Sequence, residues 1–129
     1  MALGRGERSP PFDIPAVHHV RADGPLLRSG ADALGLIYDE GVAGAEWIAV
    51  RAERLDPSFF DLSSGVAGEF VQKFVNYQQR LAVVGDLSGR LEESSALRDF
   101  VRECNRGRQV WFVADAGELT RRLSALPGT

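Results

Sequence analysis

Four short apolar segments alternate along the chain with longer segments whose apolar residues recur at helical spacing. Residues 81–85 and 110–114 are continuously apolar, which is typical of strands covered on both faces of a parallel sheet. Residues 16–22 and 45–50 are shorter or more mixed examples. The alternation predicts one small α/β domain with a four-stranded, largely parallel sheet, right-handed crossovers and flanking helices. It leaves the strand order undecided.

The segments between the predicted strands also carry signals for helix ends. A first helix is predicted over about 29–42, and a second from Asp56 and Pro57 through the apolar positions of 66–75. Gly65 and Gly68 lie inside the second helix, where glycine costs ~1 kcal/mol against alanine. They therefore indicate either close backbone contact or a break in that helix.

Two further helices are predicted after the third and fourth strands. Ser94 or Ser95 can cap the first of them, and Gly107 is placed to end it. Asp115 lies three residues before Glu118, which is a variant of the capping box and predicts the start of the last helix.

Composition narrows the class of protein. The 129 residues fit one domain, and a formal charge of −3 gives no field that would gather nucleic acid. No apolar run approaches the ~20 residues needed to cross a bilayer. We expect residues 1–12 to be a flexible leader, residues 13–127 to be the domain, and the protein to be cytoplasmic, without nucleic-acid or membrane partners.

The predicted carboxyl edge of the sheet gathers polar residues. In open α/β sheets ligands tend to bind there, and Asp56, Asp86 and Asp115 follow the last three strands. Such carboxylates could hold magnesium, but residues of this kind are more often helix caps, and no metal or cofactor is predicted. The glycines near Asp86 have neither the spacing nor the lysine of a phosphate-binding loop.

Histidine and cysteine offer little chemistry. His18 and His19 are adjacent, so on a strand they point to opposite faces and cannot both hold one metal ion. Cys104 is the single cysteine, which excludes an internal disulfide, and its place on an apolar helix face indicates an inert thiol. No catalytic residue is predicted from these side chains.

Six different short motifs are spread over most of the chain. They are Phe59-Phe60-Asp61-Leu62, Ala67-Gly68-Glu69, Gln72-Lys73-Phe74-Val75-Asn76-Tyr77, Leu81-Ala82-Val83-Val84-Gly85-Asp86, Phe100-Val101-Arg102-Glu103-Cys104-Asn105-Arg106-Gly107 and Val110-Trp111-Phe112-Val113. From about residue 15 to residue 126 the chain resembles the bacterial family called domain of unknown function 4180. The resemblance implies a stand-alone α/β protein and brings no established activity, cofactor or partner.

Ser64 is a candidate phosphorylation site. Ser63-Ser64-Gly65 resembles the Asp-Ser-Ser-Gly motif of the STAS domain of sulphate transporters and anti-sigma factor antagonists, although Leu62 separates Asp61 from the serines. The likeness implies a STAS-like layout and a regulatory serine. A phosphate at position 64 would gain from helix amides only if the predicted helix breaks near Ser63.

Two functions fit the sequence. The preferred one is a non-enzymatic binding or regulatory module that acts through a protein partner or a homodimer. Trp47, Phe59, Phe60 and Trp111 are expected in the core, and an exposed pair among them would mark an interface.

The alternative is a small enzyme or ligand-binding protein with a polar pocket around Asp86. A carboxylate could serve there as a base, a lysine as an electrostatic anchor and amides for orientation. The candidate ligand-binding residues are Glu69, Lys73, Asn76, Tyr77, Asp86, Glu103 and Asn105.

Overall fold

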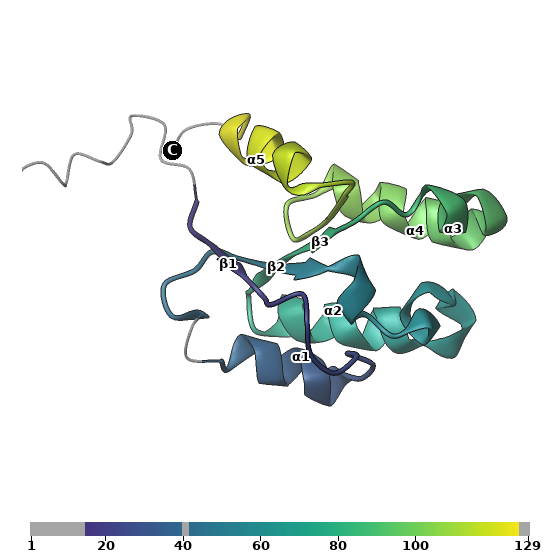
Figure 1. The fold of residues 1–129 in the computed structure, drawn as a ribbon, viewed down its shortest axis with the longest axis horizontal. Coiled ribbons are helices and arrows are strands. Elements are labelled where there is room, and N and C mark those ends of the chain that lie inside the picture. Colours follow the sequence, from purple (N-terminus) through teal and green to yellow (C-terminus); the bar gives the residue numbers. More distant parts are fainter. Residues whose placement is uncertain (1–14, 40–41, 127–129) are drawn as a thin grey trace, which may run out of the picture.

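The computed structural model describes residues 15–39 and 42–126 (Figure 1). The predicted leader, residues 1–12, lies outside them. The strands are β1 (Val17–His19), β2 (Trp47–Arg51), β3 (Arg80–Val84) and β4 (Val110–Val113). The α-helices are α1 (Gly30–Ile37), α2 (Val66–Asn76), α3 (Ser88–Glu93), α4 (Ser95–Arg106) and α5 (Ala116–Ser124). Three 3₁₀ turns, η3 (Ala52–Arg54), η4 (Pro57–Phe60) and η5 (Leu62–Ser64), connect β2 to α2.

The strands form one sheet in which every pairing is parallel and the spatial order is β1-β2-β3-β4. The predicted α/β class with a four-stranded parallel sheet is therefore confirmed, and the strand order that the sequence left open follows the chain. In the register, Ile48 pairs with Leu81 and Leu81 with Val110. Apolar residues consequently stand in rows across the sheet.

The two faces of the sheet are covered differently. Strands joined in sequence by crossovers of one hand place all crossover helices on the same face. Helices α1, α2 and α4 accordingly share one core with Ile48, Leu81 and Val110. Helix α5 covers the other face, and in Figure 1 it lies across the sheet from α1 and α2.

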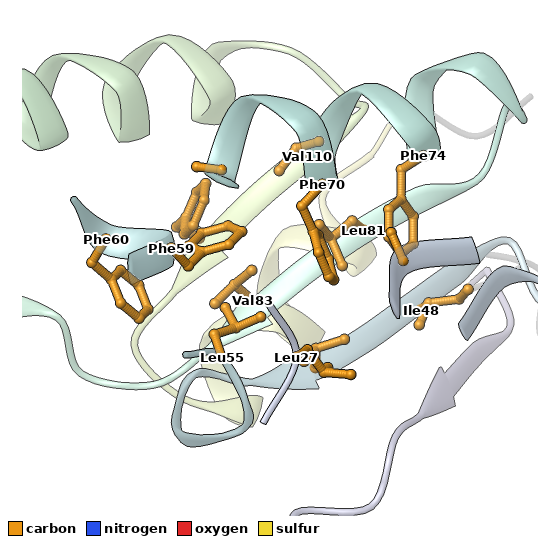
Figure 2. Packing of buried hydrophobic residues seen from close by; sticks show 14 of the residues in the cluster. Leu27, Ile48, Leu55, Phe59, Phe60, Phe70, Phe74, Leu81, Val83 and Val110 are labelled. Carbon is orange, nitrogen blue, oxygen red and sulfur yellow. The ribbon is translucent and has the colours of Figure 1, made fainter. Parts of the chain in front are cut away.

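Phenylalanine side chains dominate the face covered by three helices. Phe70 and Phe74 point from α2 onto the strands, and Phe59 reaches the same core from η4 (Figure 2). The rings of Phe59 and Phe70 meet edge to face with centroids 5.6 Å apart. Full burial of one such ring is worth roughly 1.5–3 kcal/mol, so η4 is fixed by tertiary packing.

Tryptophan side chains occupy the face covered by α5. Trp47 on β2 and Trp111 on β4 belong to the same core on this face. Their ring centroids are 4.3 Å apart, and both side chains are buried. The Arg122 guanidinium stacks 4.0 Å from the Trp111 ring centroid. Phe59 and Phe60 are buried as well, so all four aromatic residues that the sequence places in the core lie in it.

The predicted second helix is wrong at its start. A continuous helix from Pro57 is replaced by η4 and η5, and α2 begins only at Val66. The break lies at Gly65, whose φ of 80° is left-handed and favours glycine. The first helix also ends earlier than predicted, at Ile37, and residues 40–41 lie outside the described chain.

Helix α3 was not predicted, whereas the predicted caps hold. Ser94 Oγ accepts a hydrogen bond from the Leu97 amide at 3.1 Å and starts α4. Asp115 Oδ1 accepts one from the Glu118 amide at 2.8 Å and starts α5. Gly107 ends α4 as expected.

Candidate functional site

The carboxyl end of the sheet is built from the connections that follow β2 and β3. In open α/β sheets, ligand crevices usually open where the strand order reverses and adjacent connections diverge to opposite faces. The strand order of this sheet never reverses, so it has no such switch point. Any hollow at this end must come from the connections themselves. Segments η4–η5 and α3–α4 supply one.

A groove with a volume of about 340 Å³ runs between these two connections. Its first wall is η4–η5 and its second wall is the end of α3 with the start of α4. The volume falls near the lower end of the range for small-molecule sites. The groove is lined by Phe60, Asp61, Leu62, Ser63, Arg90, Glu93, Ser94, Ala96 and Leu97.

The first wall is shaped by carboxylates that hold nearby backbone. Asp56 accepts hydrogen bonds from the Ser58 amide at 3.0 Å and the Ser58 hydroxyl at 2.6 Å, and the hydroxyl bond is the main reason that the pKa of Asp56 is lowered. Asp61 binds Ser63 in the same way, with distances of 3.1 and 2.6 Å. These local bonds compete with a continuous helix and favour turns.

The second wall is held by an aspartate before α3, a capping serine and an arginine. Asp86 Oδ1 accepts from the Ser88 amide at 2.9 Å at the start of α3, and this bond lowers the pKa of Asp86. Ser94 separates α3 from α4 as the N-cap of α4. Arg98 then donates to the Leu91 carbonyl oxygen at 2.6 Å, which ties α4 back to α3.

A buried arginine supports the same end of the domain. Arg54 is 8% exposed, and its guanidinium donates to the carbonyl oxygens of Arg21, Asp23 and Pro25 at 2.7, 3.3 and 3.0 Å. It therefore holds the connection after β1 against η3. Sequence reasoning missed this role, because an Arg-rich stretch such as 51–54 looks like solvent-exposed chain.

The candidates Glu69 and Lys73 face α1. A β-carbon added at Gly30 would lie 2.7 Å from Glu69 Oε2 and 2.9 Å from Lys73 Cε. The side chains of Glu69 and Lys73 thus pack against the first turn of α1. The Glu69 carboxylate is favourable there because the first amides of a helix are free. A packing role for glycine at position 30 follows directly, and neither side chain lines the groove.

Asn76 and Tyr77 lie at the other end of the domain. Helix α2 runs back against the strands and its eleven residues span ~16 Å, so its last residues are far from Asp86. Asn76 accepts a hydrogen bond from Gln72 at 2.8 Å. The structure does not bring Asn76 and Tyr77 together with Asp86.

Tyr77 instead meets Tyr38. The two rings pack edge to face with centroids 5.6 Å apart, at the ends of α2 and α1, and they are 46% and 67% exposed. A hydrogen bond with the Tyr77 side chain raises the pKa of Tyr38 above its ordinary value. Val75, in the last turn of α2, is also exposed. Tyr38 and Tyr77 are called the tyrosine pair below.

Glu103 and Asn105 lie on α4, away from the other candidates. Glu103 pairs with Arg106 at 2.9 Å on the exposed side of the helix. Asn105 accepts from the Phe112 amide at 2.7 Å and donates to the Phe112 carbonyl oxygen at 3.2 Å. Its amide thereby pairs with the free edge of β4 as a neighbouring strand would, which protects that edge.

Ser64 does lie at the start of a helix. The break at Gly65 leaves it directly before α2, where its hydroxyl accepts from the Val66 amide at 3.1 Å and donates to the Ser58 carbonyl oxygen at 2.7 Å. The side chain is exposed. The geometry on which the phosphorylation hypothesis depended is present, and the modification itself stays a prediction.

Cys104 and the acidic residues show no reactive arrangement. Burial raises the pKa of the Cys104 thiol to about 11, so the thiol is protonated at neutral pH. In residues 15–39 and 42–126 no three His, Cys, Asp or Glu side chains are grouped as metal ligands would be. Within the same ranges no helix has the length and apolarity to span a membrane.

Comparison with known proteins places the chain in a family. No curated protein and no solved structure matches it significantly. A family model described as "Domain of unknown function (DUF4180)" matches residues 14–123, which is most of the chain. The chain therefore belongs to the DUF4180 family.

Proposed function

We propose that the chain is a non-enzymatic, cytoplasmic binding or regulatory module, and that the tyrosine pair is its contact surface for a protein partner or for a second copy of the chain. The observation that carries this proposal is the exposure of both rings. Tyr38 and Tyr77 touch each other yet remain 67% and 46% exposed, while both tryptophans and the phenylalanines Phe59, Phe60, Phe70 and Phe74 are buried.

Tyrosine is well suited to such a surface. It combines a large apolar ring with a polar hydroxyl, it loses little conformational entropy, and it is enriched among the residues that dominate binding energy. The edge-to-face contact holds each ring in place before binding. Pre-ordered rings reduce the entropic cost of association.

A second copy is the simplest occupant. Most soluble oligomers are symmetric pairs in which the same surface faces itself, and the tyrosine pair together with the exposed Val75 offers apolar area for such a contact. The expected species in solution is a dimer, and a hetero-partner would use the same rings.

Site-specific photo-crosslinking tests the proposal. A photo-reactive amino acid at position 77 should give one discrete adduct in native cells, with twice the chain's mass for a homodimer or another defined mass for a partner. Position 92, exposed on α3 at the other end of the domain, is the control. No discrete adduct from position 77, or an identical one from position 92, would contradict the proposal.

Sedimentation velocity adds a direct reading of the homodimer. The wild-type chain should sediment as a dimer, and the double variant Tyr38→Ser/Tyr77→Ser should sediment as a monomer with an unchanged circular dichroism spectrum. A dimer that survives both substitutions would place the interface elsewhere.

A further inference from the structure

We propose that the groove at the carboxyl end of the sheet binds an aliphatic diamine, with one ammonium group at each of the carboxylates Asp61 and Glu93. The two carboxylates come from opposite walls, Asp61 from the turns before α2 and Glu93 from the end of α3. The site is separate from the tyrosine pair, so it goes beyond the proposed binding function.

Charge selects the class of ligand. In the described part of the chain neither Asp61 nor Glu93 makes an ion pair, and Asp61 binds only neutral Ser63 groups. Arg90 is the cation that lines the groove, and its guanidinium lies 4.4 Å from the centre of the Phe60 ring. Two carboxylates against one guanidinium leave the lining net negative.

The apolar side chains that line the groove select the rest of the ligand. Phe60 and Leu97 are buried, Leu62 is half-buried, and all three line the groove. Methylene groups can rest on such side chains and gain ~0.8 kcal/mol each when they leave water. A chain of methylenes with a cation at either end therefore matches the apolar and acidic side chains that line the groove.

Asp61 and Glu93 are both exposed, so they would attract the two ammonium groups from a groove that faces solvent. Binding should consequently be sensitive to salt, because the charged groups remain within reach of solvent.

Calorimetric titration with 1,4-diaminobutane tests the proposal. Saturable one-site binding is expected, and the isostere 1,4-butanediol, which lacks both charges, should bind at least about tenfold more weakly, since a hydrogen bond to a charged group contributes about 1.5–3 kcal/mol. Homologues from 1,3-diaminopropane to 1,6-diaminohexane should show one preferred length.

Adjacent glutamates on α3 give a matched control. Glu93→Gln and Asp61→Asn should each weaken binding about tenfold, whereas Glu92→Gln removes the same charge one residue from the groove lining and should change affinity less than about twofold. Tyr77→Ser should bind the diamine as the wild type does, because the tyrosine pair lies at the other end.

Several outcomes would overturn the proposal. They are equal binding of the diol, equal losses in Glu92→Gln and Glu93→Gln, or no saturable binding of the diamine at about 10 mM, a concentration at which even millimolar affinity is seen. Each of them leaves the crosslinking result at position 77 unaffected, so the two proposals fail separately.

Discussion

The two ends of the domain are built in different ways. At the carboxyl end of the sheet, the irregular turns η3 to η5 insert Arg54, Phe59 and Phe60 into the interior. At the opposite end, α1 and α2 simply stop, and the tyrosine pair stands in solvent. The carboxyl end is thus fixed by burial and hydrogen bonds, and the opposite end is free to contact another molecule.

This contrast predicts that matched aromatic substitutions will differ most in stability. Phe59→Ala removes a fully buried ring and should lower the free energy of unfolding by about 3–5 kcal/mol. Tyr77→Ala removes a half-exposed ring and should cost no more than about 1 kcal/mol. Urea unfolding of both variants measures the difference. Similar losses would erase the distinction between the two ends.

The next largest effect is expected at Arg54. Arg54→Ala leaves carbonyl oxygens of the connection after β1 without their donor, and the free energy of unfolding should fall by about 1–3 kcal/mol. Arg51→Ala is the control, because Arg51 is exposed and pairs with Glu53 at 3.5 Å. Its loss should be within about 0.5 kcal/mol. Equal losses would remove Arg54 as a support of the carboxyl end.

A smaller effect is expected where the groove wall changes from α3 to α4. Ser94→Ala deletes the cap on the Leu97 amide and should cost about 1 kcal/mol, measured by urea unfolding. Ser95, the neighbouring residue, begins the helix after the cap. Ser95→Ala should be close to neutral, and a larger loss there than at Ser94 would contradict the assigned cap.

The two ends of the domain should lose stability at opposite extremes of pH. The pKa of Asp56 is lowered, chiefly by the Ser58 hydroxyl, so its stabilising effect is present above the unfolded pKa of ~3.9 and is lost as pH falls through the folded pKa. The pKa of Tyr38 is raised by Tyr77, so its effect is present below ~10 and is lost as pH rises through the folded pKa.

Melting temperature against pH separates these two contributions. Asp56→Asn should flatten the acid limb of the curve, and Tyr77→Phe should flatten the alkaline limb. The reverse assignment, or unchanged limbs in both variants, would show that these groups do not set the pH response of their ends.

The sequence predicts the regular parts of this molecule well. Continuous apolar runs mark β3 and β4, and capping residues such as Ser94 and Asp115 mark the helices that follow, because these signals act over a few neighbouring residues. For the turns before α2 the local pattern predicts helix, and the structure differs. Their path depends on Phe59 packing against Phe70 and on a left-handed Gly65, and local pattern does not encode such contacts.

The candidate site was predicted less well for the same reason. The carboxyl end of the sheet was identified from the parallel pattern, and Asp86 does lie there. The polar residues of α2 and α4 face α1, solvent or the edge of β4, since their direction is set by packing partners distant in sequence. Glu93, which lines the groove, carries no local signal that distinguishes it from Glu92.

Amide hydrogen exchange of residues 57–65 in the free protein tests most directly whether the turns at the carboxyl end of the sheet are fixed before any ligand binds. Four backbone amides there, those of Phe59, Asp61, Ser64 and Gly65, donate to carbonyl oxygens at 2.8–3.2 Å. These amides should exchange far more slowly than those of an unstructured chain, as expected for a preformed groove wall. Exchange at the unstructured rate would contradict both the packing described for this end and the groove that depends on it.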